Sequence, residues 1–248
     1  MKTKVIIPAY NEGRHLERTL NSLPNDLVEP IVAINGSSDN TLEIAEKFGA
    51  EVHVTAEQGK MLAIQHVLHS LGEQALDPLI ILDADTRPLF PTRWHNGIVK
   101  LLRQQERPAV IGGPIWYTGK PLGETVLRTA YRAARTALHK NDTGAKHAVQ
   151  FGPNMALKIQ NTDLLEIVMN IPNFWPGEDR ALTHAVLDQD GVYHTPINVG
   201  LVTTTPRSIS SISLKDRLQL GAEASFNEVE QRYTLRGNPS SEPYRDPS

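Results

Sequence analysis

Short apolar runs alternate in the first third of the chain with stretches in which apolar residues recur every three or four positions. Short runs bounded by turn-forming residues are typical of strands buried on both faces, whereas the wider spacing is typical of helices. The pattern predicts strands over residues 4–7, 30–34, 51–54 and 79–82, and helices that begin near residues 14, 41 and 61. This alternation predicts an α/β fold, with a central, mostly parallel sheet flanked by helices.

The pattern loosens after Pro91. We expect helices over residues 94–102, 161–168 and 180–187, and strands over 109–115, 150–157, 191–194 and 198–204, the last two paired or consecutive. A longer amphipathic helix is predicted over 124–139, and one of its faces is basic, with Arg128, Arg132, Arg135 and His139 at helical spacing. That face is either an ordinary solvated surface or a surface for an anionic acceptor, such as a phosphate-bearing lipid or a nucleic acid.

Composition narrows the class of protein. The chain has 248 residues, 40% of them hydrophobic and 21% charged, as in an ordinary globular protein. A formal net charge of −3 gives no bulk preference for nucleic acid or anionic membranes, and the lack of cysteine excludes disulfides, thiolate metal sites and thiol nucleophiles. No apolar stretch is long enough for a signal peptide or a membrane span, so we expect a cytoplasmic protein.

Two carboxylates follow the predicted strand over 79–82, at Asp83 and Asp85. Ligands of open α/β sheets bind beyond the carboxyl ends of the strands. The two side chains reach the same side only if the backbone turns there, because alternate residues of a strand point to opposite faces. Carboxylate oxygens suit Mg²⁺ or Mn²⁺, although an isolated Asp-x-Asp more often caps a loop and the turn that follows it.

A second acidic pair, Glu178 and Asp179, begins the predicted helix over 180–187. Helix N-termini favour negative charge, so capping alone could explain both residues. The preceding loop contains Trp175, which either stacks on a sugar or a ring or packs as an ordinary core tryptophan.

Five motifs occur in one order along the chain. They are Val5-Ile6-Ile7-Pro8-Ala9-Tyr10-Asn11-Glu12, Asn35-Gly36-Ser37-Ser38-Asp39-Asn40-Thr41, Gly59-Lys60, Asp83-Ala84-Asp85 and Glu178-Asp179. Together they resemble glycosyltransferase family 2, of the GT-A fold. The resemblance implies transfer of a sugar from a nucleoside-diphosphate sugar to an acceptor hydroxyl, with inversion at the anomeric carbon and with Mn²⁺ or Mg²⁺ as cofactor.

The resemblance also implies roles for individual residues. Asp179 matches the catalytic base. Asp85 and Asp83 match the metal-binding motif, and His194 could complete the metal shell or be an ordinary surface or core histidine. The residues implied in binding the nucleotide sugar are Pro8, Ala9, Tyr10, Glu12, Asn35, Lys60, Asp83, Ala84, Asp85 and Arg207. Those implied on the acceptor side are Asn154, Trp175 and Glu178.

The second motif departs from the family, which usually has two aspartates where this chain has Ile34 and Asn35. Asn offers both a donor and an acceptor, so a contact with the base can survive with altered preference. The Gln-x-x-Arg-Trp signature of processive synthases is missing, so we expect transfer of one sugar or a few. We expect one domain over 1–236, with a nucleotide-sugar-binding half over about 1–90, an acceptor-binding half over about 91–236, and a disordered tail over 237–248.

Two other functions stay open. A nucleotidyltransferase uses a similar sheet and a metal, but it normally carries a Gly-rich loop with Arg or Lys after the first strand, which residues 8–13 are not. A catalytically silent nucleotide-sugar-binding protein would bind a nucleoside diphosphate without turnover.

Overall fold

A seven-stranded sheet forms the centre of the molecule in the computed structural model, which describes residues 2–76, 78–118, 153–173, 178–194, 196 and 200–204. The strand order is β3-β2-β1-β4-β8-β6-β9. The strands are β1 (Thr3–Ala9), β2 (Val28–Asn35), β3 (Glu51–Thr55), β4 (Leu79–Leu82), β6 (Ala109–Gly112), β8 (Asn154–Lys158) and β9 (Val192–His194). β8 is antiparallel to β4 and β6, and the other pairs are parallel, so the predicted mostly parallel α/β fold is confirmed.

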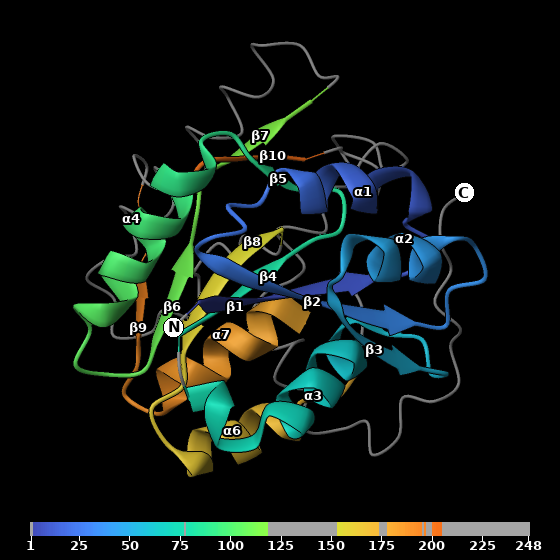
Figure 1. Cartoon of the computed structure of the whole chain (residues 1–248). Coiled ribbons are helices and arrows are strands. Elements are labelled where there is room, and N and C mark those ends of the chain that lie inside the picture. The colour runs from blue at the N-terminus through green and yellow to red at the C-terminus, as the bar shows by residue number, and fades with distance from the viewer. Residues whose placement is uncertain are drawn as a thin grey trace, which may run out of the picture.

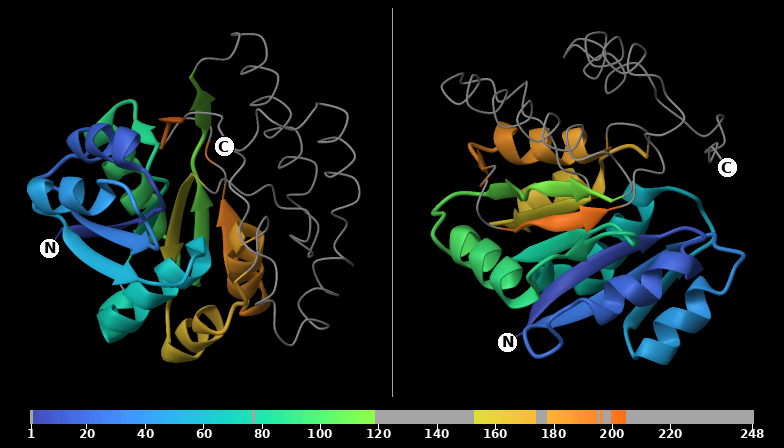
Figure 2. Two further views of the ribbon diagram at one scale, coloured as in Figure 1. Left: turned by 90° about the vertical axis from the view of Figure 1, so that its right-hand side faces the viewer. Right: turned by 90° about the horizontal axis from the view of Figure 1, so that it is seen from above.

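Helices cover both faces of this sheet (Figures 1 and 2). One face packs on α1 (Gly13–Asn21), α2 (Thr41–Phe48) and α4 (Pro91–Arg103). The other packs on α3 (Lys60–Leu71), α6 (Thr162–Met169) and α7 (Glu178–Asp188), with a 3₁₀ turn η1 (Gly72–Leu76) after α3. None of these helices, the ones that the structure describes, is long and apolar enough to cross a membrane.

Burial on both faces explains the continuous apolar runs of the sequence. All four residues of β4 are at most 1% exposed, and they alternate between the two cores: Ile80 and Leu82 face α1 and α4, whereas Leu79 and Ile81 face α3 and α6. A strand with solvent on one face would alternate apolar and polar residues instead. The β4–β8 pairing also joins the two predicted halves of the chain in one sheet.

A second, three-stranded sheet was not expected from the sequence. It consists of β5 (Arg87–Pro88), β10 (Val202–Thr204) and β7 (Ile115–Tyr117), with β10 in the middle. The strands expected near 191–194 and 198–204 are consecutive along the described chain, as β9 and β10, but they do not pair with each other. β9 extends the main sheet beside β6, and β10 turns away to the small sheet.

The carboxyl ends of the parallel strands β1 to β4 meet along one edge of the main sheet. Ala9, Asn35, Thr55 and Leu82 are the last residues of these strands. The motif residues that follow each strand are thereby gathered at the edge where open α/β sheets bind ligands.

Candidate functional site

The backbone turns immediately after β4, as the Asp-x-Asp motif requires. The carbonyl of Asp83 accepts a 2.9 Å hydrogen bond from the amide of Thr86, which closes a β-turn. The carbonyl of Ala84 inside the turn accepts a 2.7 Å bond from the buried hydroxyl of Thr19 in α1. The turn is thus fixed to the helix layer, and the backbone does not continue as a strand beyond Leu82.

Lys60 joins carboxylates that lie far apart in the sequence. It is the first residue of α3, and its Nζ is 2.8 Å from Asp83 Oδ1 and 3.3 Å from Asp179 Oδ1. Asp179 comes from the first turn of α7, 119 residues further along the chain. The structure therefore brings together four of the residues that the sequence singled out: Lys60, Asp83, Asp85 and Asp179.

Negative charge dominates this cluster. Burial raises the pKa of Asp83, and the nearby Asp85 and Asp179 raise it further, while the attraction and hydrogen bond of Lys60 act in the opposite direction. The net effect is a raised pKa for the Asp83 carboxyl. Asp83, Asp85 and Asp179 together carry more negative charge than the single Lys60 ammonium balances, and a bound cation would relieve this excess.

The donor set fits a hard divalent cation. Asp83 and Asp85 supply carboxylate oxygens, and Asp85 Oδ1 is oriented by a 3.0 Å bond from the hydroxyl of Thr204 in β10. In the part of the chain that the structure describes, no group of three or more His, Cys, Asp or Glu side chains is arranged to hold a metal ion. Mg²⁺ and similar ions are commonly held by one or two carboxylates together with water and substrate phosphates, so two protein carboxylates are sufficient.

His194 does not lie in this cluster; its place in the ligand-free protein agrees with the alternative of an ordinary surface histidine, and a role as third metal ligand stays a prediction. It is exposed at the end of β9, and its Nε2 is 3.1 Å from Oε1 of Gln105. β9 lies at the far edge of the main sheet from β3, three strands beyond β4.

Asn154 makes structural contacts in the described residues, and its expected role on the acceptor side stays a prediction. Its side chain is fully buried, accepts a 3.1 Å bond from Trp94 Nε1 and donates a 2.5 Å bond to the carbonyl of Gly200. Both ends of its amide are used inside the protein. Asn154 therefore ties β8 to α4 and to the chain that enters β10.

The loops after β1 and β2 are fastened to each other by a series of hydrogen bonds. The amides of Asn11, Glu12 and Gly13 donate to the side chains of Ser37, Thr41 and Asp39. In return the amide of Ser38 donates to Asn11 Oδ1. These bonds fix the loop that the resemblance assigns to the nucleotide, including the backbone of Glu12.

A second set of bonds links this loop to Asn173, in the segment that follows α6. Gln58 Nε2 donates to the hydroxyl of Tyr10, and the carbonyl of Gln58 accepts from Nδ2 of Asn173, each at 3.0 Å. Gly59 between Gln58 and Lys60 has a φ of 146°, and a Cβ there would collide with the Asn173 side chain. Only glycine fits at this position, because other residues disfavour that φ and would fill the space that Asn173 takes.

Asn35 presents an unsatisfied polar atom. It is the last residue of β2, the residue is 5% exposed, and its Oδ1 accepts no hydrogen bond from any residue that the structure describes. A buried acceptor without a donor costs roughly 1–3 kcal/mol, so such atoms in native proteins usually have a partner. A ligand N–H is one such partner.

The remaining predicted residues divide into two groups. Pro8 and Ala9 end β1, and Ala84 lies in the turn; all three are buried, so only their backbone can face a ligand. Trp175, Arg207, the basic helix over 124–139 and the tail over 237–248 lie outside the described residues, as does the side chain of Glu178.

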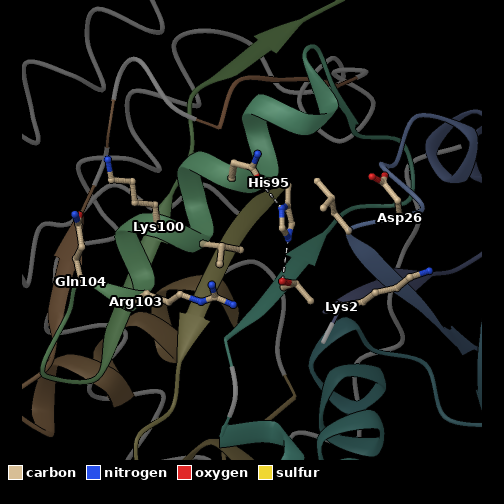
Figure 3. Close-up of a pocket in the computed structure, with 10 residues that line it drawn as sticks. Lys2, Asp26, His95, Lys100, Arg103 and Gln104 are labelled. Atoms are coloured by element: carbon tan, nitrogen blue, oxygen red, sulfur yellow. Dashed lines mark hydrogen bonds between the residues drawn. The ribbon is translucent and has the colours of Figure 1, made fainter.

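A cavity of about 820 Å³ lies elsewhere, between α4 and the beginning of β1 (Figure 3). His95 is on its floor, where its Nε2 is 2.9 Å from the Thr3 hydroxyl. Lys100 and Arg103 on its rim are in the last turn of α4, where the helix dipole favours cations. Thr3 begins β1 and Ala9 ends it, so this cavity is at the opposite edge of the sheet from the carboxylates.

Sequence reasoning missed three residues of the site: Thr204, Gln58 and Asn173. Thr204 is the last residue of the strand that the sequence predicts over 198–204, but nothing in its spacing shows contact with Asp85. The signal for Gln58 is its position beside Gly59-Lys60, and Asn173 gives no signal in one sequence.

The sequence profile of a known family matches this chain. Residues 4–166 match the family described as Glycosyl transferase family 2, a span that includes the edge where Lys60, Asp83 and Asp85 meet. The chain belongs to glycosyltransferase family 2. The family that its motifs resemble is confirmed, and with it the GT-A fold.

Curated relatives of this family 2 chain match over short spans. Glycosyltransferase AglE of Haloferax volcanii is 33% identical over 94 residues, which cover 34% of this chain and 30% of that protein. Glycosyltransferase AglD of the same organism is 41% identical over 59 residues, 21% of this chain and 10% of that protein. Protein RfbJ of Shigella flexneri is 28% identical over 83 residues, 33% of this chain and 62% of that protein. The matches thus span less than two thirds of these relatives.

Solved structures show the same fold over nearly the whole chain. Glucosyl-3-phosphoglycerate synthase from Mycobacterium tuberculosis, in complex with Mn²⁺, UDP and glucosyl-3-phosphoglycerate, aligns with a TM-score of 0.58 at 19% identity, over 95% of this chain and 81% of that one. Its complex with Mn²⁺, UDP-glucose and glycerol 3-phosphate aligns with a TM-score of 0.56, at the same identity and coverage. At this identity the likeness is one of fold.

Proposed function

We propose that this protein is a metal-dependent, inverting glycosyltransferase that moves a sugar from a nucleoside-diphosphate sugar to an acceptor hydroxyl. The observation that carries the proposal is a cluster at the carboxyl edge of the sheet, in which Lys60 contacts Asp83 and Asp179, and Asp85 lies near Asp83. Family membership supports it, and so does the fold shared with a synthase solved with Mn²⁺ and UDP.

On the donor side, Asp85 and Asp83 hold the divalent ion, Mn²⁺ or Mg²⁺. When bound, that ion neutralises the charge that develops on the departing diphosphate. Thr204 keeps the Asp85 carboxylate in one orientation. Arg207, which follows β10 by a few residues, is proposed to approach the diphosphate.

The base of the nucleotide is proposed to lie over the end of β2. β2 is two strands from β4, which is about 10 Å at ordinary strand spacing and comparable with the reach of a nucleoside from its diphosphate. The unsatisfied Oδ1 of Asn35 then accepts an N–H of the base. A uridine nucleotide fits this site. The ring N–H of uracil can donate to Asn35 Oδ1, and the uracil carbonyl beside it can accept from the Asn35 NH₂ group. Tyr10 and Glu12 frame the same space.

On the acceptor side, Asp179 takes the proton from the attacking hydroxyl. An inverting transfer needs a base on the face of the sugar opposite to the leaving diphosphate, and Asp179 comes from α7, across Lys60 from Asp83. Lys60 Nζ lies 3.3 Å from Asp179 Oδ1 in the ligand-free protein and holds that carboxylate beside the cluster. Trp175 and Glu178, in and after the loop before α7, are proposed to shape the acceptor pocket.

The test is the kinetics of Asp179→Asn with a panel of nucleotide sugars. Removing the base should lower kcat by roughly a hundredfold or more, while the affinity for the donor is retained. Asp188→Asn is the matched control, since it removes an exposed carboxylate from the last residue of the same helix α7. Lost donor binding with normal kcat at saturation would refute Asp179 as the base. Nucleoside diphosphate binding without any turnover would favour the silent binding protein.

An anionic acceptor is proposed from the basic face of the predicted helix over 124–139. If Arg128, Arg132 and Arg135 contact the acceptor, replacing all three by Gln should raise the acceptor KM and flatten its dependence on salt, while donor binding hardly changes. An unaltered acceptor KM would show that this basic face is an ordinary solvated surface.

A further inference from the structure

We propose that Lys60 occupies the place of the divalent ion in the nucleotide-free protein and makes metal binding depend on the arrival of the nucleoside diphosphate. The proposal rests on the proposed function, because it concerns the same carboxylates. It goes further, since it assigns Lys60 a second task and orders the binding of metal and nucleotide.

The geometry of the Lys60 ammonium carries the first step. Nζ is 2.8 Å from Asp83 Oδ1 and 3.3 Å from Asp179 Oδ1, and the three side chains are only 20–29% exposed. A divalent ion bound to Asp83 would lie about 2.0–2.6 Å from a carboxylate oxygen. An ion at that distance from Oδ1 and an ammonium at 2.8 Å from the same atom would repel each other strongly in a partly enclosed site. A metal ion that uses this oxygen therefore has to displace the ammonium.

The backbone at Lys60 is fixed, so the exchange involves only its side chain. Asn173 covers Gly59 and donates to the carbonyl of Gln58, while the carbonyl of Gly59 accepts the 3.0 Å helical bond from Ala63. Lysine has a flexible four-carbon stem that can move its charge over several ångströms from a fixed Cα. The ammonium can leave Asp83 without any change in α3.

A nucleoside diphosphate supplies what this exchange needs. Its phosphate oxygens give the ammonium a new negative partner and give the metal additional ligands at the same moment. A metal ion that binds alone is repelled by the Lys60 ammonium beside Asp83. When the nucleotide is bound, the ammonium has moved to the phosphates and this repulsion is smaller. Metal and nucleotide must then each raise the affinity of the other by the same factor, because coupling between two binding sites is reciprocal.

The test measures binding of Mn²⁺ alone to the full chain by calorimetry or by the EPR signal of free Mn²⁺. Lys60→Met keeps the length of the side chain and removes its charge. It should bind Mn²⁺ without nucleotide about tenfold more tightly than the wild type, or better, and the factor by which UDP improves Mn²⁺ binding should shrink correspondingly. Affinity for UDP should fall as well, since a phosphate partner is lost.

Two variants serve as controls. Lys60→Arg keeps the charge and should bind Mn²⁺ alone as weakly as the wild type. Lys47→Met removes one exposed charge from the last turn of α2 and should change nothing. Lys60→Gln repeats the measurement with a polar neutral side chain if Lys60→Met does not fold.

Mn²⁺ binding to nucleotide-free Lys60→Met or Lys60→Gln that is no tighter than in the wild type would overturn the proposal. So would a wild type that binds Mn²⁺ equally well with and without UDP. A separate result would refute the proposed glycosyltransferase activity. In that case wild-type protein with Mn²⁺ would neither bind nor turn over any nucleotide sugar, whatever the affinity of Lys60→Met for Mn²⁺ alone.

Discussion

Replacing Asp39 by Ala should loosen the two loops that frame the proposed nucleotide site. Asp39 Oδ2 accepts a 3.0 Å bond from the amide of Gly13 at the start of α1. Its Oδ1 accepts a 3.0 Å bond from the amide of Thr41 at the start of α2, and a short bond from the Thr41 hydroxyl. One carboxylate therefore joins the beginnings of two helices that follow β1 and β2.

The magnitude follows from these bonds. A hydrogen bond in a protein contributes about 0.5–1.5 kcal/mol net, and loss of an acidic residue that binds helix-start amides typically costs about 1 kcal/mol. Asp39 is exposed, so water replaces part of what is lost. We expect Asp39→Ala to lower the free energy of unfolding by about 2 kcal/mol, and Asp39→Asn by about half as much, because the amide keeps one acceptor oxygen.

Urea denaturation followed by circular dichroism measures this directly. For a domain of this size, a loss of about 2 kcal/mol corresponds to a fall of about 4–8 °C in Tm. Asp26→Ala is the matched control: Asp26 is also exposed, but its carboxylate makes no hydrogen bond or ion pair within the described ranges of the chain. It should cost less than about 0.5 kcal/mol. Affinity for UDP should fall in Asp39→Ala but not in Asp26→Ala.

The difference between wild type and Asp39→Ala should depend on pH. Burial acts to raise the pKa of Asp39, but the bonds from the Thr41 side chain and from the amides of Gly13 and Thr41 outweigh it and hold the pKa below its ordinary value of 3.8. A carboxyl with a lowered folded pKa stabilises fully above the ordinary value and loses this contribution as the pH falls through the lowered one. Equal stability of the two proteins at neutral pH, or a difference that grows in acid, would refute the reasoning.

Three further changes have definite expected outcomes. Asp85→Asn should abolish the metal-dependent part of UDP binding, the part that EDTA removes, because the ion loses one carboxylate ligand. The Tm of the ligand-free protein should stay the same, and calorimetric titration measures the loss of UDP binding. Gly59→Ala should cost more than about 1 kcal/mol in urea denaturation, because the φ of 146° is strained for alanine and Asn173 has to move. Trp94→Phe should cost about 2 kcal/mol, because it leaves the buried Asn154 Oδ1 without its donor, and the KM for the donor should not change.

Residues near each other in sequence could be placed from the sequence because their geometry is local. The turn after Leu82 follows from an apolar run that stops at two carboxylates, and the structure closes it with the Asp83–Thr86 bond. Asn154 shows the opposite case. A polar residue after a glycine and a proline is typical of an exposed loop, but β8 lies between β4 and β6, and that burial turns the side chain to Trp94 and Gly200.

The sequence by itself determined the strands of the main sheet, the described helices and the edge of the sheet where the motifs end. Continuous apolar runs can be accommodated only in strands covered on both faces, and parallel strands bring their carboxyl ends to one edge. Only the tertiary structure decided which charges meet there. The contacts of Lys60 with Asp83 and Asp179, and of Thr204 with Asp85, join segments separated by up to 119 residues. They depend on the packing of α3, α7 and the small sheet around that edge, and no local pattern in the chain encodes the distance between two charges on different elements.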